Sequence, residues 1–222
     1  MSIGIKRRLM KNLKAKWITK TPNNRLYQIP VPIIGLTGGI GTGKSTVANI
    51  LREKGIVIID ADKLVKNIYQ KTETFEFITQ HFPTAIIEGI IHFPTLRKLA
   101  FDNLSSKTLL ENFIYAELPD EFKKAYAAFI DPSFIIYDVP LLFEKKLNLL
   151  VDLSVCVYAS RKIQIERIIT RDHISFELAS KIVDDQMNIE DKKRCSDLII
   201  INDQGTLELK TNVDRFLEEI CF

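Results

Sequence analysis

One glycine-rich segment constrains the fold of this chain more than any other feature. Residues 38–45 read Gly-Gly-Ile-Gly-Thr-Gly-Lys-Ser and match the pattern G-x-x-x-x-G-K-[ST]. A short apolar run over residues 33–37 precedes the segment, and an amphipathic helical pattern over residues 44–54 follows it. This context of strand, loop and helix is the one that a phosphate-binding loop requires. The segment therefore predicts a nucleotide-binding site.

The residue types of this loop explain how it would hold phosphate. Glycines allow tight turns and bring backbone N–H groups close to phosphate oxygens, and the start of the following helix favours negative charge. Lys44 is expected to reach the β- and γ-phosphates of ATP, and the hydroxyl of Ser45 to ligate Mg²⁺. The predicted nucleotide-binding residues here are Gly38, Gly39, Gly41, Thr42, Gly43, Lys44, Ser45 and Thr46.

The rest of the chain alternates apolar runs with helical patterns. Runs typical of buried strands recur at residues 56–59, 134–137, 153–157 and 198–201. This alternation predicts an α/β fold with a parallel sheet, helices on both faces, and ligands at the carboxyl ends of the strands. Residues 61–130 lose the strand pattern and are interpreted as a helical insertion. A length of 222 residues with 46% hydrophobic residues suits one such domain over residues 31–222.

Residues 1–30 form a basic N-terminal extension with eight Lys or Arg and no acidic residue, whereas the remainder is mildly acidic. Leu9, Leu13 and Trp17 have helical spacing, which allows contact with anionic membrane or RNA, or an organelle presequence. The alternative is a dispensable extension, or upstream sequence translated in a gene model. The mildly acidic net charge of residues 31–222 argues against a nucleic-acid partner.

The cysteine pattern favours a reducing compartment. Cys156, Cys195 and Cys221 form no C-x-x-C pair, so we expect neither a zinc site nor a disulfide framework. No apolar run approaches the roughly 18 residues of a membrane-spanning helix. We expect a cytoplasmic protein that is a monomer or weak homo-oligomer. His81, His92 and His173 lack the spacing of a metal site.

Two aspartates follow the second apolar run. Asp60 and Asp62 are two residues apart, so in an extended chain both carboxylates would point the same way, towards the nucleotide. One of the two carboxylates would hold Mg²⁺ through water and the other would accept a proton from an attacking hydroxyl, with Asp60 as the candidate Mg²⁺ ligand. The alternative is that either aspartate caps the helix that begins near Lys63.

Four segments carry a family resemblance. Residues 34–64, IGLTGGIGTGKSTVANILREKGIVIIDADKL, closely resemble the opening of the dephospho-coenzyme A kinase family. Residues 138–144 (DVPLLFE), residues 164–172 followed by Gln186, and residues 196–202 (SDLIIIN) resemble three further motifs of that family in the same order. The resemblance runs from about residue 33 to the C-terminus. It implies a P-loop kinase-like fold with a helical substrate-binding insertion over 61–130 and a helical lid over 160–188.

The resemblance also implies a reaction and roles for residues. The reaction is transfer of the ATP γ-phosphate, with Mg²⁺, to the ribose 3′-hydroxyl of dephospho-coenzyme A. Asp62 matches the family's general base, Arg167 or Arg171 its lid arginine, Asn202 a residue near the ATP base, and Arg97 a substrate-binding arginine. Paired lid arginines suit the stabilisation of charge on a transferring phosphate, although a solvated helix face is the alternative.

The chain also departs from the family pattern. Many family members have Leu-His-Pro where residues 114–116 read Ile-Tyr-Ala, and residues 88–94 lack the usual Asp-Arg pair. Two rival functions remain open at this stage. One is another small P-loop kinase that acts on a nucleotide or metabolite, and the other is an ATP-binding regulator without turnover. Phe75, Phe77 and Phe82 are expected to pack the helical insertion or to line a groove for the acceptor.

Overall fold

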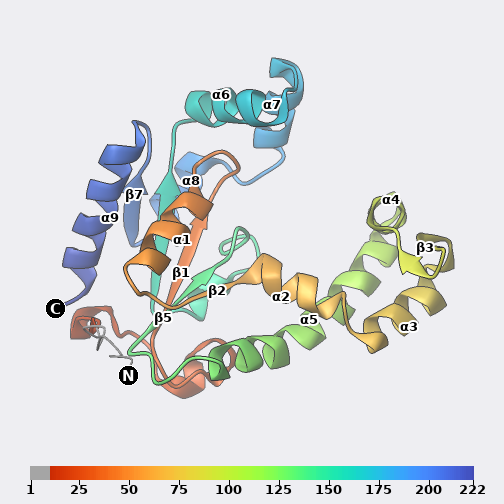
Figure 1. Ribbon diagram of the computed structural model, residues 1–222, viewed down its shortest axis with the longest axis horizontal. Helices are drawn as coiled ribbons and strands as arrows, with labels where there is room; N and C mark the ends of the chain where they lie inside the picture. The colour runs from red at the N-terminus through yellow and green to blue at the C-terminus, as the bar shows by residue number, and fades with distance from the viewer. Residues whose placement is uncertain (1–10) are drawn as a thin grey trace, which may run out of the picture. The chain divides into compact units, whose positions relative to one another are not determined.

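The computed structural model describes residues 11–222, so Lys6, Arg7, Arg8 and Leu9 of the basic extension lie outside the described residues. The chain divides into two compact units. The first comprises the chain up to Ile59 together with Phe129–Phe222, and the second comprises Asp60–Ala128. Figure 1 shows the elements of both. No helix within residues 11–222 is long and apolar enough to cross a membrane.

The first unit is built on a five-stranded sheet in the order β2-β5-β1-β6-β7. Strand β1 pairs in parallel with β5 and β6, and β6 pairs in parallel with β7. This architecture confirms the predicted α/β fold class. The strands are β1 (Ile33–Gly38), β2 (Ile58–Asp60), β5 (Ile135–Asp138), β6 (Leu153–Tyr158) and β7 (Leu198–Ile201).

The two faces of the sheet bury different sets of side chains, because alternate strand residues point in opposite directions. Leu36 and Val155 belong to the main core, which includes side chains of helices α1 (Lys44–Glu53) and α9 (Thr206–Ile220). Cys156 packs instead with Tyr158 and with Ile189 of helix α8 (Ile189–Cys195). Helix α8 therefore covers the face opposite to α1 and α9 (Figure 1).

Two helices of the first unit lie in the segment for which a lid is predicted. Helix α6 (Arg161–Asp172) ends at His173, which adopts a left-handed conformation with φ of 54°, and helix α7 (Phe176–Asp184) follows. The two helices bury a small apolar cluster of their own, which comprises Ile165, Ile168, Ala179 and Val183. This pair therefore has its own packing and sits apart from the main core (Figure 1).

The described part of the N-terminal extension does not form the amphipathic helix that its spacing suggests. It forms three short 3₁₀ turns, Ala15–Trp17, Pro22–Asn24 and Leu26–Gln28. Leu13 instead pairs in an antiparallel bridge with Cys221 and is only 5% exposed. Local helical periodicity gave the wrong element because Leu13 is buried by a distant part of the chain.

Arg25 anchors the extension to the first unit. Its Nε lies 2.6 Å from Oδ2 of Asp152, and both side chains are almost fully buried. The same carboxylate oxygen accepts a hydrogen bond from the backbone N–H of Ile33, the first residue of β1, at 2.9 Å. Arg25 also donates to the carbonyl oxygens of Lys20 and Ile29. The extension is therefore bound to the strand that leads into the phosphate loop.

The second unit is mostly helical. Its helices are α2 (Ala61–Ile68), α3 (Thr72–His81), α4 (Phe93–Asp102) and α5 (Leu104–Ala127). It also contains a small hairpin, β3 (Ile86–Ile87) and β4 (Ile90–Ile91), that the sequence pattern did not reveal. Both turn residues have positive φ, 51° at Glu88 and 75° at Gly89, as a type I′ turn requires. Short 3₁₀ turns at Pro83–Ala85 and Leu147–Leu149 complete the elements of the two units.

Candidate functional site

The phosphate loop lies between β1 and α1, as the sequence predicts. Gly41 and Gly43 have φ of 77° and 83°, values that side chains rarely tolerate. A Cβ atom at Gly43 would lie 2.3 Å from Nδ2 of Asn202. Gly43 precedes the first residue of α1, so Lys44, Ser45 and Thr46 all belong to the first turn of that helix. The loop thus has the backbone geometry and the helix start that anion binding requires.

Lys44 forms an ion pair with Asp138, the last residue of β5. The side chains of Lys44 and Asp138 are 15% and 5% exposed, respectively. Strand β5 is the neighbour of β1, so its carboxyl end lies beside the loop. Asp138 is not among the site residues predicted from the sequence. The signal was available, because an apolar strand that ends in aspartate next to a phosphate loop is a common Mg²⁺-binding arrangement.

Two predicted site residues, Asn202 and Arg167, form hydrogen bonds with the phosphate loop. Nδ2 of Asn202 donates to the carbonyl oxygen of Thr42 at 2.7 Å, and Asn202 is buried. Arg167 donates from Nη1 to the carbonyl oxygen of Gly41 at 3.2 Å and from Nη2 to that of Asn202 at 2.8 Å. The contacts of Asn202 and Arg167 with the loop reach its backbone carbonyl oxygens. They therefore hold the loop without occupying the N–H groups that would bind phosphate.

The base of the lid also contacts the loop. Oε1 of Gln186 accepts a hydrogen bond from the backbone N–H of Ile40 at 2.7 Å. Gln164 of α6 is 1% exposed and donates to the carbonyl oxygen of Ala159. Its backbone carbonyl oxygen would lie 2.7 Å from a Cβ atom at Gly41. Residues at the base of this helix pair therefore contact the phosphate loop directly.

The structure distinguishes the two candidate lid arginines. Arg171 forms an exposed two-pronged pair with Asp172, with both distances 2.7 Å. This pairing raises the pKa of Arg171 and lowers the pKa of the Asp172 carboxyl. Arg167 and Arg171 nevertheless line the same hollow of about 290 Å³ on α6. Of the two, Arg167 is the one in contact with the phosphate loop.

The two aspartates at the start of the second unit have different surroundings. Oδ1 of Asp60 accepts a hydrogen bond from the backbone N–H of Lys63 at 3.1 Å, so Asp60 is the N-cap of α2. Asp62 is exposed on the first turn of α2 and lines a large pocket of the second unit. The capping interpretation thus describes Asp60 in this structure. Its role as an Mg²⁺ ligand stays a prediction.

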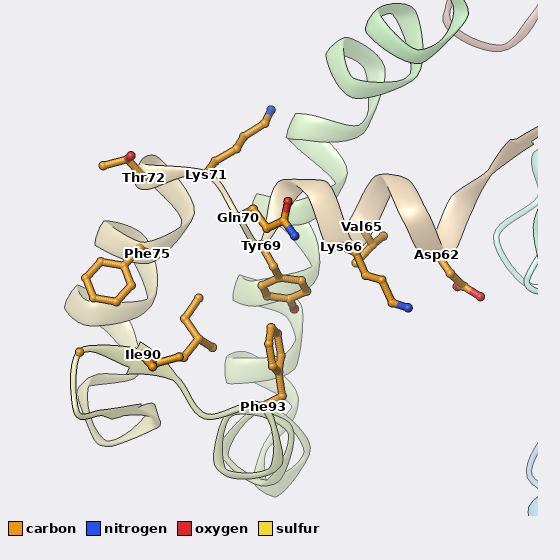
Figure 2. A pocket seen from close by; sticks show the side chains of 12 residues that line it. Asp62, Val65, Lys66, Tyr69, Gln70, Lys71, Thr72, Phe75, Ile90 and Phe93 are labelled. Atoms are coloured by element: carbon orange, nitrogen blue, oxygen red, sulfur yellow. The ribbon is translucent and has the colours of Figure 1, made fainter.

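The pocket of the second unit has a volume of about 960 Å³. Figure 2 shows the rings of Tyr69 and Phe93 close together, with Ile90 and Phe75 beside them and Asp62 at the other end of α2. The centroids of the two rings are 5.1 Å apart and the rings are nearly perpendicular. The remaining lining residues are Val65, Lys66, Gln70, Lys71, Thr72, Gly89 and Ile91. The pocket therefore combines an apolar wall with charged and polar groups.

Charged residues surround this pocket. Nζ of Lys71 lies 2.9 Å from Glu117 and 3.0 Å from Glu121 of α5. Burial raises the pKa of the Tyr69 phenol, and the nearby charge of Arg97 partly opposes that shift. Arg97 itself is exposed on α4 and is not part of the pocket lining. Its predicted contact with substrate stays a prediction.

The three phenylalanines of the insertion have different surroundings, and a groove for the acceptor stays a prediction. Phe75 lines the pocket, whereas Phe77 stacks on Phe113 with centroids 4.0 Å apart, and Phe82 is buried. Tyr115, at the departure from the family pattern, is an exposed residue in the middle of α5. Within residues 11–222, no three His, Cys, Asp or Glu residues form a group suited to a metal ion.

Comparisons with known proteins agree with this geometry. The dephospho-CoA kinase family model matches residues 32–208. A dephospho-CoA kinase of Fusobacterium nucleatum is 37% identical over 86% of this chain and 99% of its own length. One from Helicobacter pylori is 38% identical over 84% of this chain and 96% of its own.

Two solved structures extend the comparison to three dimensions. The crystal structure of TT1252 from Thermus thermophilus is 28% identical, with a TM-score of 0.78 over 85% of this chain and 97% of the other. The dephospho-CoA kinase from Campylobacter jejuni is 25% identical, with a TM-score of 0.62 over 84% and 96% of the two chains. With its braced phosphate loop and these relatives along most of its length, the chain belongs to the dephospho-CoA kinase family.

Proposed function

We propose that this protein transfers the γ-phosphate of ATP to the ribose 3′-hydroxyl of dephospho-coenzyme A. The observation that supports this most directly is the phosphate loop with Lys44 paired to Asp138, in a chain that matches the kinase family over residues 32–208. Phosphoryl transfer depends mainly on positioning and on the stabilisation of charge. The protein therefore has to hold two substrates and provide cations around the transferred group.

ATP binds through the loop. The backbone N–H groups of residues 38–45 and the start of α1 surround the β- and γ-phosphates, and the ammonium of Lys44 contacts them. Lys44 has three N–H donors, so it can keep Asp138 as a partner while it binds phosphate. Asn202 supports this loop through its hydrogen bond to Thr42, and the family resemblance implies a position near the ATP base.

Mg²⁺ suits the oxygen donors found at the start of α1 and at the carboxyl ends of β2 and β5. The Ser45 hydroxyl would ligate the ion, with Asp60 as the acidic partner predicted from the sequence and Asp138 as the one that the structure adds. Carboxylate and hydroxyl oxygens are the protein ligands that Mg²⁺ prefers. When bound, the ion would supply positive charge that offsets the negative charge developing on the transferred phosphoryl group.

The acceptor binds in the pocket of the second unit. Dephospho-coenzyme A has a long, weakly polar pantetheine arm, which suits the wall formed by Phe75, Ile90 and Phe93. Asp62 at one end of the pocket accepts the proton of the attacking 3′-hydroxyl. Arg97, exposed near Tyr69, provides positive charge for the diphosphate of the acceptor.

The lid completes the electrostatic arrangement. Arg167 already contacts the phosphate loop, and from there its guanidinium reaches the transferred phosphoryl group when the lid closes over ATP. Arg171 can join it after leaving Asp172, since the two arginines are one helical turn apart on the same face. Fixed cations of this kind lower the free energy of the transition state without reorganisation.

One assay tests this function and its rivals. ADP release from ATP and Mg²⁺ is measured with dephospho-coenzyme A, and in parallel with each common nucleoside monophosphate as acceptor. We expect release that depends on dephospho-coenzyme A and disappears in Lys44→Ala, while the exposed Lys54→Ala retains it. Preference for a monophosphate would indicate another kinase of this fold. ATP binding without transfer to any acceptor would indicate a regulator.

A variant of the pocket tests the acceptor site separately. Phe75→Ala removes part of the apolar wall without touching the phosphate loop. We expect the KM for dephospho-coenzyme A to rise while the KM for ATP is unchanged. Phe77→Ala is the control, because Phe77 stacks on Phe113 and is not part of the lining. An equal rise of both KM values in Phe75→Ala would contradict this placement of the acceptor.

A further inference from the structure

We infer that Lys192 of α8 is a positioning residue for ATP·Mg²⁺, because it fixes the segment that follows Asp138. This inference rests on the proposed function only in assigning ATP to the phosphate loop. Lys192 is 1% exposed, although lysine is among the residue types that are almost never fully buried unless paired. Its neighbours on α8, Lys193 and Arg194, are partly or fully exposed.

The ammonium of Lys192 has two partners on one short segment. Nζ lies 2.6 Å from the carbonyl oxygen of Pro140 and 2.8 Å from Oε1 of Glu144. Pro140 and Glu144 both belong to the stretch directly after β5. The cation therefore holds that stretch at both of its ends against α8.

The carbonyl oxygen of Pro140 is also tied to the strand of the phosphate loop. It accepts a second hydrogen bond, from Oγ1 of the fully buried Thr37, at 2.9 Å. Thr37 directly precedes Gly38, the first residue of the loop, and Val139 donates its N–H to the carbonyl oxygen of Leu36. One carbonyl group thus joins α8, the end of β1 and the segment after β5.

Asp138 lies two residues before this junction and holds Lys44. A displacement of Pro140 would therefore move the carboxylate that sets the position of the Lys44 ammonium. Thr37 and Cys156 are register partners in β1 and β6, so their side chains point to the same face of the sheet, which is the face covered by α8. Burial raises the pKa of the Cys156 thiol, and the nearby charge of Lys192 partly opposes that shift.

Helix α8 is itself a fixed support for Lys192. Glu190 accepts a hydrogen bond from the phenol of Tyr158 in β6 at 2.6 Å, and the ammonium of Lys193 lies 4.2 Å from the centre of the same ring. The helix begins shortly after Gln186, which binds the N–H of Ile40. Lys192 consequently connects α8 to the segment that follows β5.

Removal of one partner from a fully buried ion pair is strongly destabilising, but the Glu144 side chain is 24% exposed and stays in contact with water when its cation is removed. Lys192→Met should thus give a folded protein whose main defect is the placement of Asp138 and Lys44. Groups that orient the ligands of a metal or phosphate typically change affinity or activity by about 10- to 100-fold. We expect kcat/KM for ATP at fixed Mg²⁺ to fall by that factor.

The test compares Lys192→Met with Lys193→Met in the full-length protein. Steady-state kinetics are measured against ATP, Mg²⁺ and dephospho-coenzyme A, together with thermal unfolding. The expected result is a fall in kcat/KM for ATP and a higher Mg²⁺ requirement in Lys192→Met alone, with the KM for dephospho-coenzyme A unchanged. Wild-type kinetics in Lys192→Met overturn the inference. So does a proportional loss with every substrate, which indicates a general packing defect.

Two further variants keep the inference testable if Lys192→Met does not fold. Thr37→Val removes the other hydrogen bond to Pro140, and Glu144→Gln removes the charge of a partly exposed partner. Each is expected to shift the ATP and Mg²⁺ parameters in the same direction as Lys192→Met and by less. If the ATP and Mg²⁺ parameters are unchanged in both variants, the inference is overturned.

Failure of the proposed function can be told apart from failure of the inference on Lys192. If the wild type transfers nothing to dephospho-coenzyme A, the acceptor assignment fails. Mg²⁺-dependent binding of ATP to wild type and Lys192→Met, followed by calorimetry, still measures the effect of Lys192. Weaker binding in the variant supports the inference without any acceptor, and equal binding overturns it.

Discussion

The ammonium of Lys44 and the carboxylate of Asp138 form an ion pair between the phosphate loop and the end of the neighbouring strand β5. Both groups are largely buried, so their mutual attraction is screened less than that of a surface pair. The pair fixes the Lys44 side chain before any phosphate arrives. It also places an oxygen ligand suitable for Mg²⁺ beside the loop.

Substitution of Asp138 should therefore impair the use of ATP·Mg²⁺. We expect Asp138→Asn to lower kcat/KM for ATP by about 10- to 100-fold and to raise the Mg²⁺ concentration needed for half-maximal rate. An Mg²⁺ titration of the initial rate measures both. Asp214→Asn, at a half-exposed carboxylate on α9, is the matched control. A normal Mg²⁺ titration in Asp138→Asn would remove Asp138 from the site.

Asp62 and Asp60 should respond differently to the same substitution. Asp62→Asn is expected to lower kcat by about 10²- to 10⁴-fold with little change in ATP binding, since the base acts on the acceptor hydroxyl. Asp60→Asn retains a side chain that can cap α2, so its effect reports on Mg²⁺ binding. Rates and ATP affinity of both variants give the comparison. Equal loss of ATP affinity in Asp62→Asn would make Asp62 a metal ligand or a structural residue.

The two lid arginines should also differ. Arg167 contacts the phosphate loop, whereas Arg171 is paired with Asp172 on the surface. We expect Arg167→Ala to lower kcat by about 10²- to 10³-fold, the effect of losing one fixed donor to a transition state, and Arg171→Ala to lower it less. Arg161→Ala, which removes an exposed pair with Asp184, serves as the control within the lid. A larger effect of Arg171→Ala would reverse the assignment.

The Arg25–Asp152 pair should make the N-terminal extension necessary for stability. Removal of Arg25 leaves the buried carboxylate of Asp152 without its cation, which costs about 3–5 kcal/mol in comparable buried pairs. We expect Arg25→Met to lower the free energy of unfolding in urea by that amount. Lys16→Met breaks an exposed pair with Glu219 and should change it by about 1 kcal/mol or less. Wild-type stability in Arg25→Met would make the extension dispensable.

The three cysteines should react at different rates. Burial raises the pKa of Cys156 to about 12 and also raises the pKa of Cys221, whereas Cys195 is exposed. At pH 8 a thiol with that pKa is only about 10⁻⁴ ionised, and the thiolate is the reactive form. Titration of the native protein with a chromogenic disulfide reagent should give one fast thiol. Cys195→Ser should abolish the fast phase. Two fast thiols would show that the buried sites open readily.

The parts of this molecule that follow local rules were predictable from the sequence. The phosphate loop and its flanking elements are specified by glycines, a β-branched run and an amphipathic pattern within about twenty residues. The parallel sheet follows from the alternation of such segments. The hairpin at Glu88 and Gly89 escaped because its strands are only two residues long and its turn lacks the usual Asn-Gly or Asp-Gly pair.

Features that depend on distant contacts were not predictable. Leu13 has helical spacing with Trp17, yet its pairing with Cys221 decides its conformation. The burial of Lys192 is invisible in a run of basic residues on a short helix, because it depends on Pro140 and Glu144. The sequence allowed Asp60 to cap a helix, and the cap became visible only through the hydrogen bond from the N–H of Lys63. Local patterns specify elements, whereas long-range contacts assign the partners of charged residues.

The bridge between Leu13 and Cys221 has a consequence for synthesis on the ribosome. Leu13 emerges early, but the segment that buries it is made after nearly all the rest of this sequence. The first unit therefore cannot close until translation has passed Cys221, whereas residues 60–128 are continuous and can fold while the chain is still growing. A nascent chain stalled within α9 would leave Leu13 exposed, so interrupted products should be recognised by chaperones and proteases.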